Sequence, residues 1–198
     1  MRSERFFKNE LLDFAEVRYS RGSNAPFKPH LHRSMSIGAV DQGAVHYQVG
    51  SEKTTLTPGA LAIINPETLH SCNPLNNQER SYYMLYLDVD WCTRVQQSIW
   101  EIDSFVAAEK IRIDDEPLYA HYCSTMENLI DDQVHLQEKE QLLFDLTRKV
   151  FGISCSLQKS RNQSVENIEL LKSLLSNDLQ KDLPLNTLAQ SLAANPYT

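Results

Sequence analysis

The chain has 198 residues, of which 41% are hydrophobic and 23% charged, a composition typical of one globular domain with a smaller appendage. Its formal net charge of −7 argues against a stand-alone nucleic-acid binder, because phosphate contacts require a basic face. No stretch approaches the roughly 18 uninterrupted apolar residues of a transmembrane helix, and no apolar secretory segment follows the N-terminus.

The cysteines indicate a reducing compartment. Cys72, Cys92, Cys123 and Cys155 are scattered and form no Cys-x-x-Cys pair, so neither a zinc ribbon nor a dithiol site is indicated. Reduced thiols are typical of a bacterial-type cytoplasm. We therefore expect a cytoplasmic protein with no membrane partner.

The first 90 residues contain short apolar runs separated by glycine and proline, which predicts a small barrel or sandwich. We expect strands at 35–40, 44–49, 54–57, 60–64 and 82–88. In the last of these, alternation places Tyr82, Met84 and Tyr86 on one face. That face suits a small organic ligand, although plain core packing is an equally good interpretation of each residue.

Residues 91–155 are mainly helical in pattern. One apolar stripe opens near Pro117 and a second follows after a short polar loop, which predicts an antiparallel helix pair. The stripes consist of Leu118, Tyr122, Met126, Leu129 and Ile130, and of Leu142, Leu143, Leu146 and Val150. They either cover the barrel or provide a dimer interface, and the pattern does not separate these alternatives.

A polar stretch at 156–163 reads as a linker, and residues 164–198 are helical again. The sequence therefore predicts a domain at 1–155, a linker at 156–163 and a further helical region at 164–198.

Three histidines are the best candidates for site chemistry. His30 and His32 lie on one face of an extended segment, and His70 follows the strand at 60–64, so the three can converge at one mouth of a barrel. Three imidazoles can bind zinc, but the acidic ligand common in such sites is missing: Ser36 stands four residues after His32, and Glu67 lies in a turn. The pattern favours hydrogen bonds across the mouth, or an organic ligand, over a metal.

Catalytic motifs are absent from the sequence. It contains no G-x-S-x-G, H-E-x-x-H or P-loop pattern, and its adjacent carboxylate pairs do not face each other. We therefore expect a binding module and not an enzyme.

A resemblance to a known family rests on Pro29 to His32, the strand at 36–40 with its Gly43 turn, and the segment 56–66. The segment's most specific part is Pro58-Gly59, an apolar run, Pro66 and then His70. This pattern resembles the N-terminal ligand-sensing domain of AraC-family transcriptional regulators. The resemblance implies a mainly β, cupin-like jelly-roll barrel followed by dimerisation helices. It implies that the pocket is lined by His30, His32, Val40, His70, Cys72, Tyr82, Met84 and Tyr86.

The tail resembles the start of the same family's helix-turn-helix domain. Residues 182–192 look like its first helix, and Asn195, Pro196, Tyr197 and Thr198 match the opening of a recognition helix. Ala193-Ala194 stands where the family often has glycine. The expected helix-turn-helix is incomplete, which predicts a truncated form that shows no specific operator binding by itself.

The leading hypothesis is the sensor and dimerisation region of a bacterial regulator. A small-molecule effector of unknown identity in the barrel would control DNA binding by a C-terminal domain mostly absent here, in a homodimer. The resemblance implies no cofactor. The alternatives are a metal-dependent cupin enzyme using His30, His32 and His70, and a sugar- or amino-acid-binding module; the tail argues against both.

The expected pocket contains no obvious arginine or lysine, which disfavours a strongly anionic effector. Four basic residues lie near the edge of the expected barrel and could reach into it: Arg18, Arg21, Lys28 and Arg33.

Overall fold

The computed structural model describes residues 3–157, and Met1–Cys155 form one compact unit. Antiparallel strands form a six-stranded sheet in the order β1-β2-β8-β3-β6-β9 and a three-stranded sheet in the order β5-β4-β7. The strands are β1 (Ser3–Lys8), β2 (Ala15–Ser23), β3 (Met35–Gln42), β4 (Val45–Val49), β5 (Glu52–Leu56), β6 (Ala60–Ile64), β7 (His70–Pro74), β8 (Arg80–Leu87) and β9 (Arg112–Asp114). The helices are α1 (Val89–Gln97), α2 (Glu116–Ile130) and α3 (Leu136–Ser154), with short 3-10 turns η1 (Glu10–Leu12) and η2 (Leu75–Asn77).

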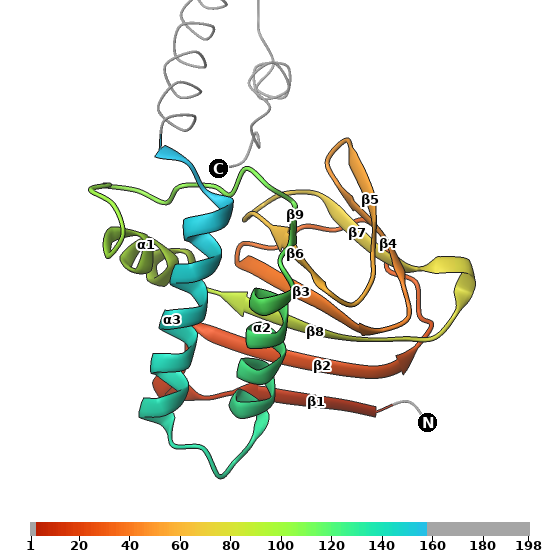
Figure 1. Cartoon of the computed structure of the whole chain (residues 1–198), viewed down its shortest axis with the longest axis horizontal. Coiled ribbons are helices and arrows are strands. Elements are labelled where there is room, and N and C mark those ends of the chain that lie inside the picture. Colours follow the sequence, from red (N-terminus) through yellow and green to blue (C-terminus); the bar gives the residue numbers. More distant parts are fainter. Residues whose placement is uncertain (1–2, 158–198) are drawn as a thin grey trace, which may run out of the picture. The chain divides into compact units, whose positions relative to one another are not determined.

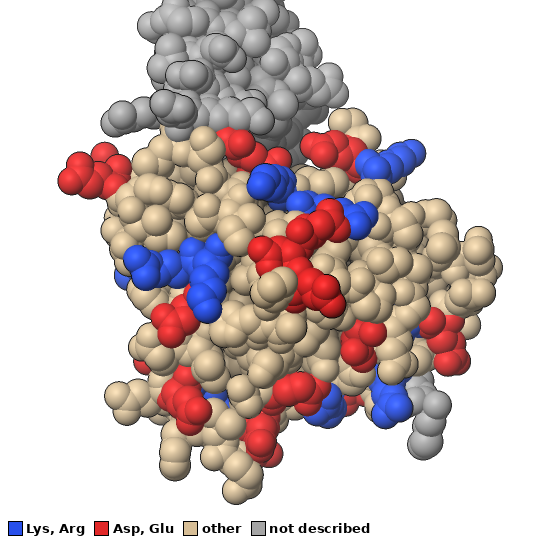
Figure 2. Space-filling view, in the orientation of Figure 1, with Lys and Arg blue, Asp and Glu red and all other residues tan. Residues whose placement is uncertain are grey.

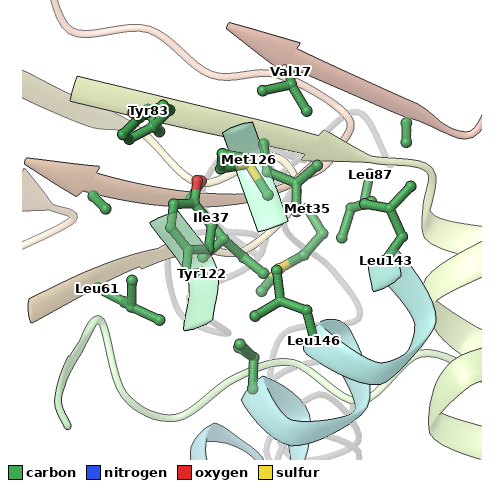
Figure 3. Packing of buried hydrophobic residues seen from close by; sticks show 14 of the residues in the cluster. Val17, Met35, Ile37, Leu61, Tyr83, Leu87, Tyr122, Met126, Leu143 and Leu146 are labelled. Carbon is green, nitrogen blue, oxygen red and sulfur yellow. The ribbon is translucent and has the colours of Figure 1, made fainter. Parts of the chain in front are cut away.

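The six-stranded sheet separates two apolar cores. Helices cover one of its faces, where α2 and α3 run antiparallel and side by side (Figure 1). Alternation along β8 sends Tyr83, Leu85 and Leu87 into this helix-side core (Figure 3), while Met84 joins the core between the two sheets. The sequence prediction for the two faces of this strand is therefore confirmed.

Two tyrosines attach α2 to the central strand β3. The hydroxyl of Tyr122 donates to the carbonyl of Ile37 at 2.7 Å, and that of Tyr119 donates to the carbonyl of Val40 at 2.8 Å. Tyr122 is fully buried beside Ile37 (Figure 3), so its hydrogen bond is shielded from water. The helix pair is thus joined to the sheet by directional bonds as well as by apolar packing.

Local sequence explains where the helices begin. Asp88 accepts from the backbone N–H of Trp91 at the start of α1, and Asp115 does the same for Leu118 at the start of α2. Pro117 lies in the first turn of α2, where its missing N–H costs no intrahelical hydrogen bond. The end of α2 is held by the buried Lys139 of α3, whose ammonium donates to the carbonyl of Leu129 at 2.8 Å.

The predicted mainly-β fold with a helix pair is confirmed. All five expected strands are present: the strand at 60–64 has the expected bounds, and the other four have shifted ends. The apolar stripes of α2 and α3 pack within the chain's own core, except for the half-buried Leu142. The sheets form two separate hydrogen-bonded sets among the described residues, so closure into a ring is not confirmed. Strands β1, β2, β7 and β9 and helix α1 were not predicted individually.

The expected linker beyond Leu157 and the helical region at 164–198 lie outside the described residues. Within the part of the chain that is described, no helix is both long enough and apolar enough to cross a membrane.

Candidate ligand-binding site

A cavity of about 140 Å³ lies between the two sheets. A cavity of roughly 150 Å³ holds a benzene molecule, so this volume suits a small organic ligand. Its apolar wall contains Val40, Val45, Leu56, Ala62, Ile64 and Met84. Its polar lining contains Arg18, His30, His70, Arg80, Tyr82 and Tyr86.

The wall formed by the six-stranded sheet depends on a glycine. Gly38 of β3 lies opposite Met84 of β8, and a Cβ atom at position 38 would stand 2.6 Å from the Met84 sulfur. The missing side chain therefore lets Met84 pack flat against β3. Across the cavity, the buried Tyr47 hydroxyl donates to the carbonyl of Ile63 at 2.7 Å and fixes the separation of the sheets.

One side of the cavity is closed by the covering segment, residues 24–34, which joins β2 to β3. Its Phe27 N–H donates to Asn73 Oδ1 at 2.7 Å, and His30 exchanges two backbone hydrogen bonds with His70 at 3.0 and 3.1 Å. Further along, the N–H of Glu67 donates to the carbonyl of His32 at 2.7 Å. These bonds lay the segment along β7 like a short extra strand, with Phe27 and His30 at the cavity.

The three predicted histidines gather at this covering segment. The ring centre of His70 lies 4.4 Å from that of His30 and 4.8 Å from that of His32. Each Nδ1 lies within 2.9–3.1 Å of a carbonyl oxygen two residues away in sequence. Because a carbonyl oxygen can only accept, each Nδ1 is the nitrogen that donates this hydrogen bond.

Burial lowers the pKa of two of these histidines, His70 and His32. It lowers the pKa of His70 from its ordinary 6.5 to about 4. Neighbouring imidazoles act in the same direction, because a second positive charge nearby is unfavourable. His32 and His70 are therefore neutral at pH 7.

The cluster does not fit a metal centre. Among residues 3–157, no group of three or more His, Cys, Asp or Glu side chains is arranged to hold a metal ion. The Nε2 atom of His32 instead lies 3.4 Å from the hydroxyl of Ser36, the residue that stands where an acidic ligand would be expected.

Arg80 is the main site residue that the sequence analysis missed. It begins β8, its side chain is 2% exposed, and it lines the cavity. Its guanidinium donates to the carbonyls of Ser23 at 2.8 Å and Ala25 at 3.1 Å, and it lies 5.1 Å from the ring centre of Tyr82. Extending the alternation of Tyr82 and Met84 back by two residues would have placed position 80 on the pocket face. The expectation of a pocket without arginine is therefore wrong.

Arg18 is a second cation at the cavity. It pairs with Met84 across β2 and β8, and it donates to Glu4 Oε1 at 2.7 Å. Its Nε atom is buried and has no hydrogen-bond partner in the structure. Of the four basic residues considered from the sequence, Arg18 lines the cavity, whereas Arg21, Lys28 and Arg33 are exposed.

The structure brings the predicted pocket residues together. Seven of them line the cavity: His30, Val40, His70, Cys72, Tyr82, Met84 and Tyr86. The eighth, His32, lies beside them, with its ring centre 5.5 Å from that of Tyr86. Their role in binding stays a prediction. The predicted DNA-contacting residues at 195–198 lie outside the described residues.

Comparison with solved structures bears on the fold. The apo form of a ToxT variant from Vibrio cholerae matches with a TM-score of 0.53 and 12% identity, over 93% of this chain and 72% of that one. Oxalate decarboxylase from Bacillus subtilis (TM-score 0.36, 14% identity) and AerE from Microcystis aeruginosa (0.39, 17%) match 39% and 50% of this chain. The present chain spans only 22% and 42% of those two proteins, and their similarity is too low to support an argument.

No curated protein matches the sequence significantly. The family model of the AraC-like ligand binding domain, in contrast, matches residues 14–150, a range that contains the residues lining the cavity, the covering segment, α2 and most of α3. The chain therefore belongs to the family of AraC-like ligand-binding domains.

Proposed function

We propose that this chain is the effector-sensing and dimerisation region of a cytoplasmic AraC-type transcriptional regulator and has no enzymatic role. A small molecule bound between the two sheets would control DNA binding by a C-terminal helix-turn-helix domain in a homodimer. The single observation that carries the proposal is a cavity of about 140 Å³ whose lining residues all fall within the range that matches the family's ligand-binding domain.

The attachment of α2 gives this proposal a physical route. One face of β3 contributes Gly38 and Val40 to the cavity, while carbonyls of the same strand accept hydrogen bonds from Tyr119 and Tyr122 of α2. A ligand that binds one arrangement of this strand more tightly than another shifts the equilibrium toward the first by the difference in binding free energy. The helix pair, which is bonded to the strand, shifts with it. We infer that the helix pair transmits the shift to the dimer and to the DNA-binding domain.

Differential scanning fluorimetry tests the proposal directly. The full chain is heated with a panel of small metabolites and divalent ions, with and without EDTA, because a ligand of the folded state raises the melting temperature. We expect an organic compound to stabilise the protein equally in EDTA. Stabilisation by one divalent ion, lost in EDTA, would instead support the metal-dependent enzyme.

A cavity-filling substitution locates the site. Met84→Trp replaces a flexible thioether with a bulky indole ring where residue 84 meets Gly38. It should therefore abolish the response to the effector, while the circular dichroism spectrum stays that of a folded protein. Leu69→Trp is the matched control, because Leu69 is 54% exposed and does not line the cavity. Unchanged effector affinity in folded Met84→Trp would contradict this location.

A further inference from the structure

We propose that the ligand of this cavity is a small organic monocarboxylate, held at its carboxylate by Arg80 and Arg18 and at its apolar body by the wall between the sheets. This inference rests on the proposed function, in which the cavity is the effector site. It replaces the sequence-based expectation that an anionic effector is disfavoured.

The charge of the lining favours an anion. Arg18 and Arg80 line the cavity, and none of the described residues that line it is aspartate or glutamate. The whole chain has a formal net charge of −7, and acidic and basic side chains are mixed on the face drawn in Figure 2. A cavity with cationic groups and low-dielectric walls concentrates anions even in an acidic protein.

Arg80 is held in place before any ligand arrives. Its guanidinium lies 5.1 Å from the ring centre of Tyr82 and 5.5 Å from that of Phe27, and both rings line the cavity. The carbonyl of Ser23, at the end of β2, and that of Ala25, in the covering segment, fix the plane of the group. A fixed, planar guanidinium matches the two oxygens of a carboxylate better than it matches a neutral amide or hydroxyl.

Arg18 supplies a donor that the folded chain leaves unused. Its Nε atom is buried without a hydrogen-bond partner, which is unfavourable for any buried donor. Glu4 Oε1 accepts a hydrogen bond from the terminal Nη2 of the same guanidinium at 2.7 Å. A ligand oxygen near Tyr82 and Tyr86 would accept from this Nε–H and give it a hydrogen-bond partner.

The size and the opposite wall restrict the rest of the ligand. About 140 Å³ accommodates a single ring or a short aliphatic chain, and it is too small for a nucleotide or an oligosaccharide. Val40, Val45 and Ile64 present only hydrocarbon to the cavity, where a polar body would lose its hydrogen bonds to water. One acidic group on a small apolar body fits both parts of the lining.

Isothermal titration calorimetry of the full chain at pH 7.5 tests the ligand class without any substitution. Benzoate and hexanoate are compared with benzamide and hexanamide, which keep the shape and remove the charge. We expect the carboxylates to bind roughly tenfold or more tightly than their amides, as expected for a hydrogen bond to a charged group. Equal or tighter binding of the amides, or no binding of the carboxylates, would overturn the assignment.

Substitutions then locate the charge. We expect Arg80→Gln to lower carboxylate affinity roughly tenfold to a hundredfold, Arg80→Lys to lower it less, and Arg18→Gln to lower it without affecting amide binding. Arg33→Gln removes the same charge from the exposed surface of the covering segment and should leave affinity unchanged. An equal effect of Arg33→Gln would show that net charge, and not the cavity, attracts the anion.

Met84→Trp separates failure of this inference from failure of the proposed function. Neutral compounds that bind the wild-type chain, and lose affinity in Met84→Trp, would overturn the carboxylate while the sensor cavity stands. Carboxylates that bind wild type and Met84→Trp equally would overturn the cavity as the site, and with it both proposals. Folding of every variant is checked by circular dichroism, because Arg80 also holds the covering segment.

Discussion

At the scale of single residues, His70 shows how burial keeps an imidazole uncharged. Burial and two neighbouring imidazoles lower the pKa of His70 from 6.5 to about 4. The unfolded chain therefore binds more protons than the folded chain between these two values. Folding stability rises with pH across that interval, and the contribution of His70 is lost as the pH falls toward 4.

Urea unfolding at pH 7 and at pH 4.5 measures this contribution. We expect the wild-type chain to lose about 1–3 kcal/mol more of its free energy of unfolding than His70→Gln does, because the glutamine side chain does not titrate. Titrating carboxylates act equally on both proteins and cancel in the comparison. His46→Gln, at an exposed position, is the control. An identical pH dependence in wild type and His70→Gln would contradict the prediction.

At the scale of elements, the sequence predicts those strands and helices whose apolar residues repeat at regular spacing. Strand β8 and the helix pair were found because their buried faces repeat at regular spacing. Strand β1 buries only Phe7 and lies at the sheet edge, so it has no alternation to detect. Strand β2 does alternate, through Ala15, Val17 and Tyr19, and could have been predicted. Arg80 was missed because the expected β8 began two residues late, at position 82.

The hydrogen bond between α2 and β3 gives a stability prediction at this scale. Tyr122→Phe keeps the buried ring and removes the hydroxyl that donates to the carbonyl of Ile37. We expect its free energy of unfolding to fall by about 1 kcal/mol, as for the loss of one typical intramolecular hydrogen bond. The half-buried Tyr119→Phe should lose less, since water can replace its hydroxyl. Unchanged stability of Tyr122→Phe in urea would contradict the assigned role.

At the scale of the whole molecule, two apolar cores share one sheet, and residues up to Cys155 form a compact unit. The sequence pattern could not reveal how the covering segment packs, because its placement depends on long-range bonds such as Phe27 to Asn73 and Arg80 to Ala25. Nor could it assign the helix stripes, whose burial within the chain depends on the sheet beneath them.

Limited proteolysis tests the predicted boundary at this scale. The polar stretch at 156–163 offers few apolar side chains to pack, so we expect trypsin to cut first at Lys159 or Arg161 and to leave a stable fragment beginning near the N-terminus. Mass spectrometry of the early products identifies the cut. A first cut at Lys28 or Arg33 would show that the covering segment opens more readily than the expected linker is cleaved.

Because β3 contacts both the cavity and α2, the residues that line the cavity differ in how freely they can be substituted. A substitution at Gly38 or Val40 alters the strand on which α2 is seated, so a new ligand shape gained there disturbs helix docking as well. The covering segment and β7 touch the ligand space without touching the helix-side core. Substitutions at positions such as Phe27, His30 and Cys72 can therefore change the ligand preference of relatives and engineered variants with the least disturbance of helix docking.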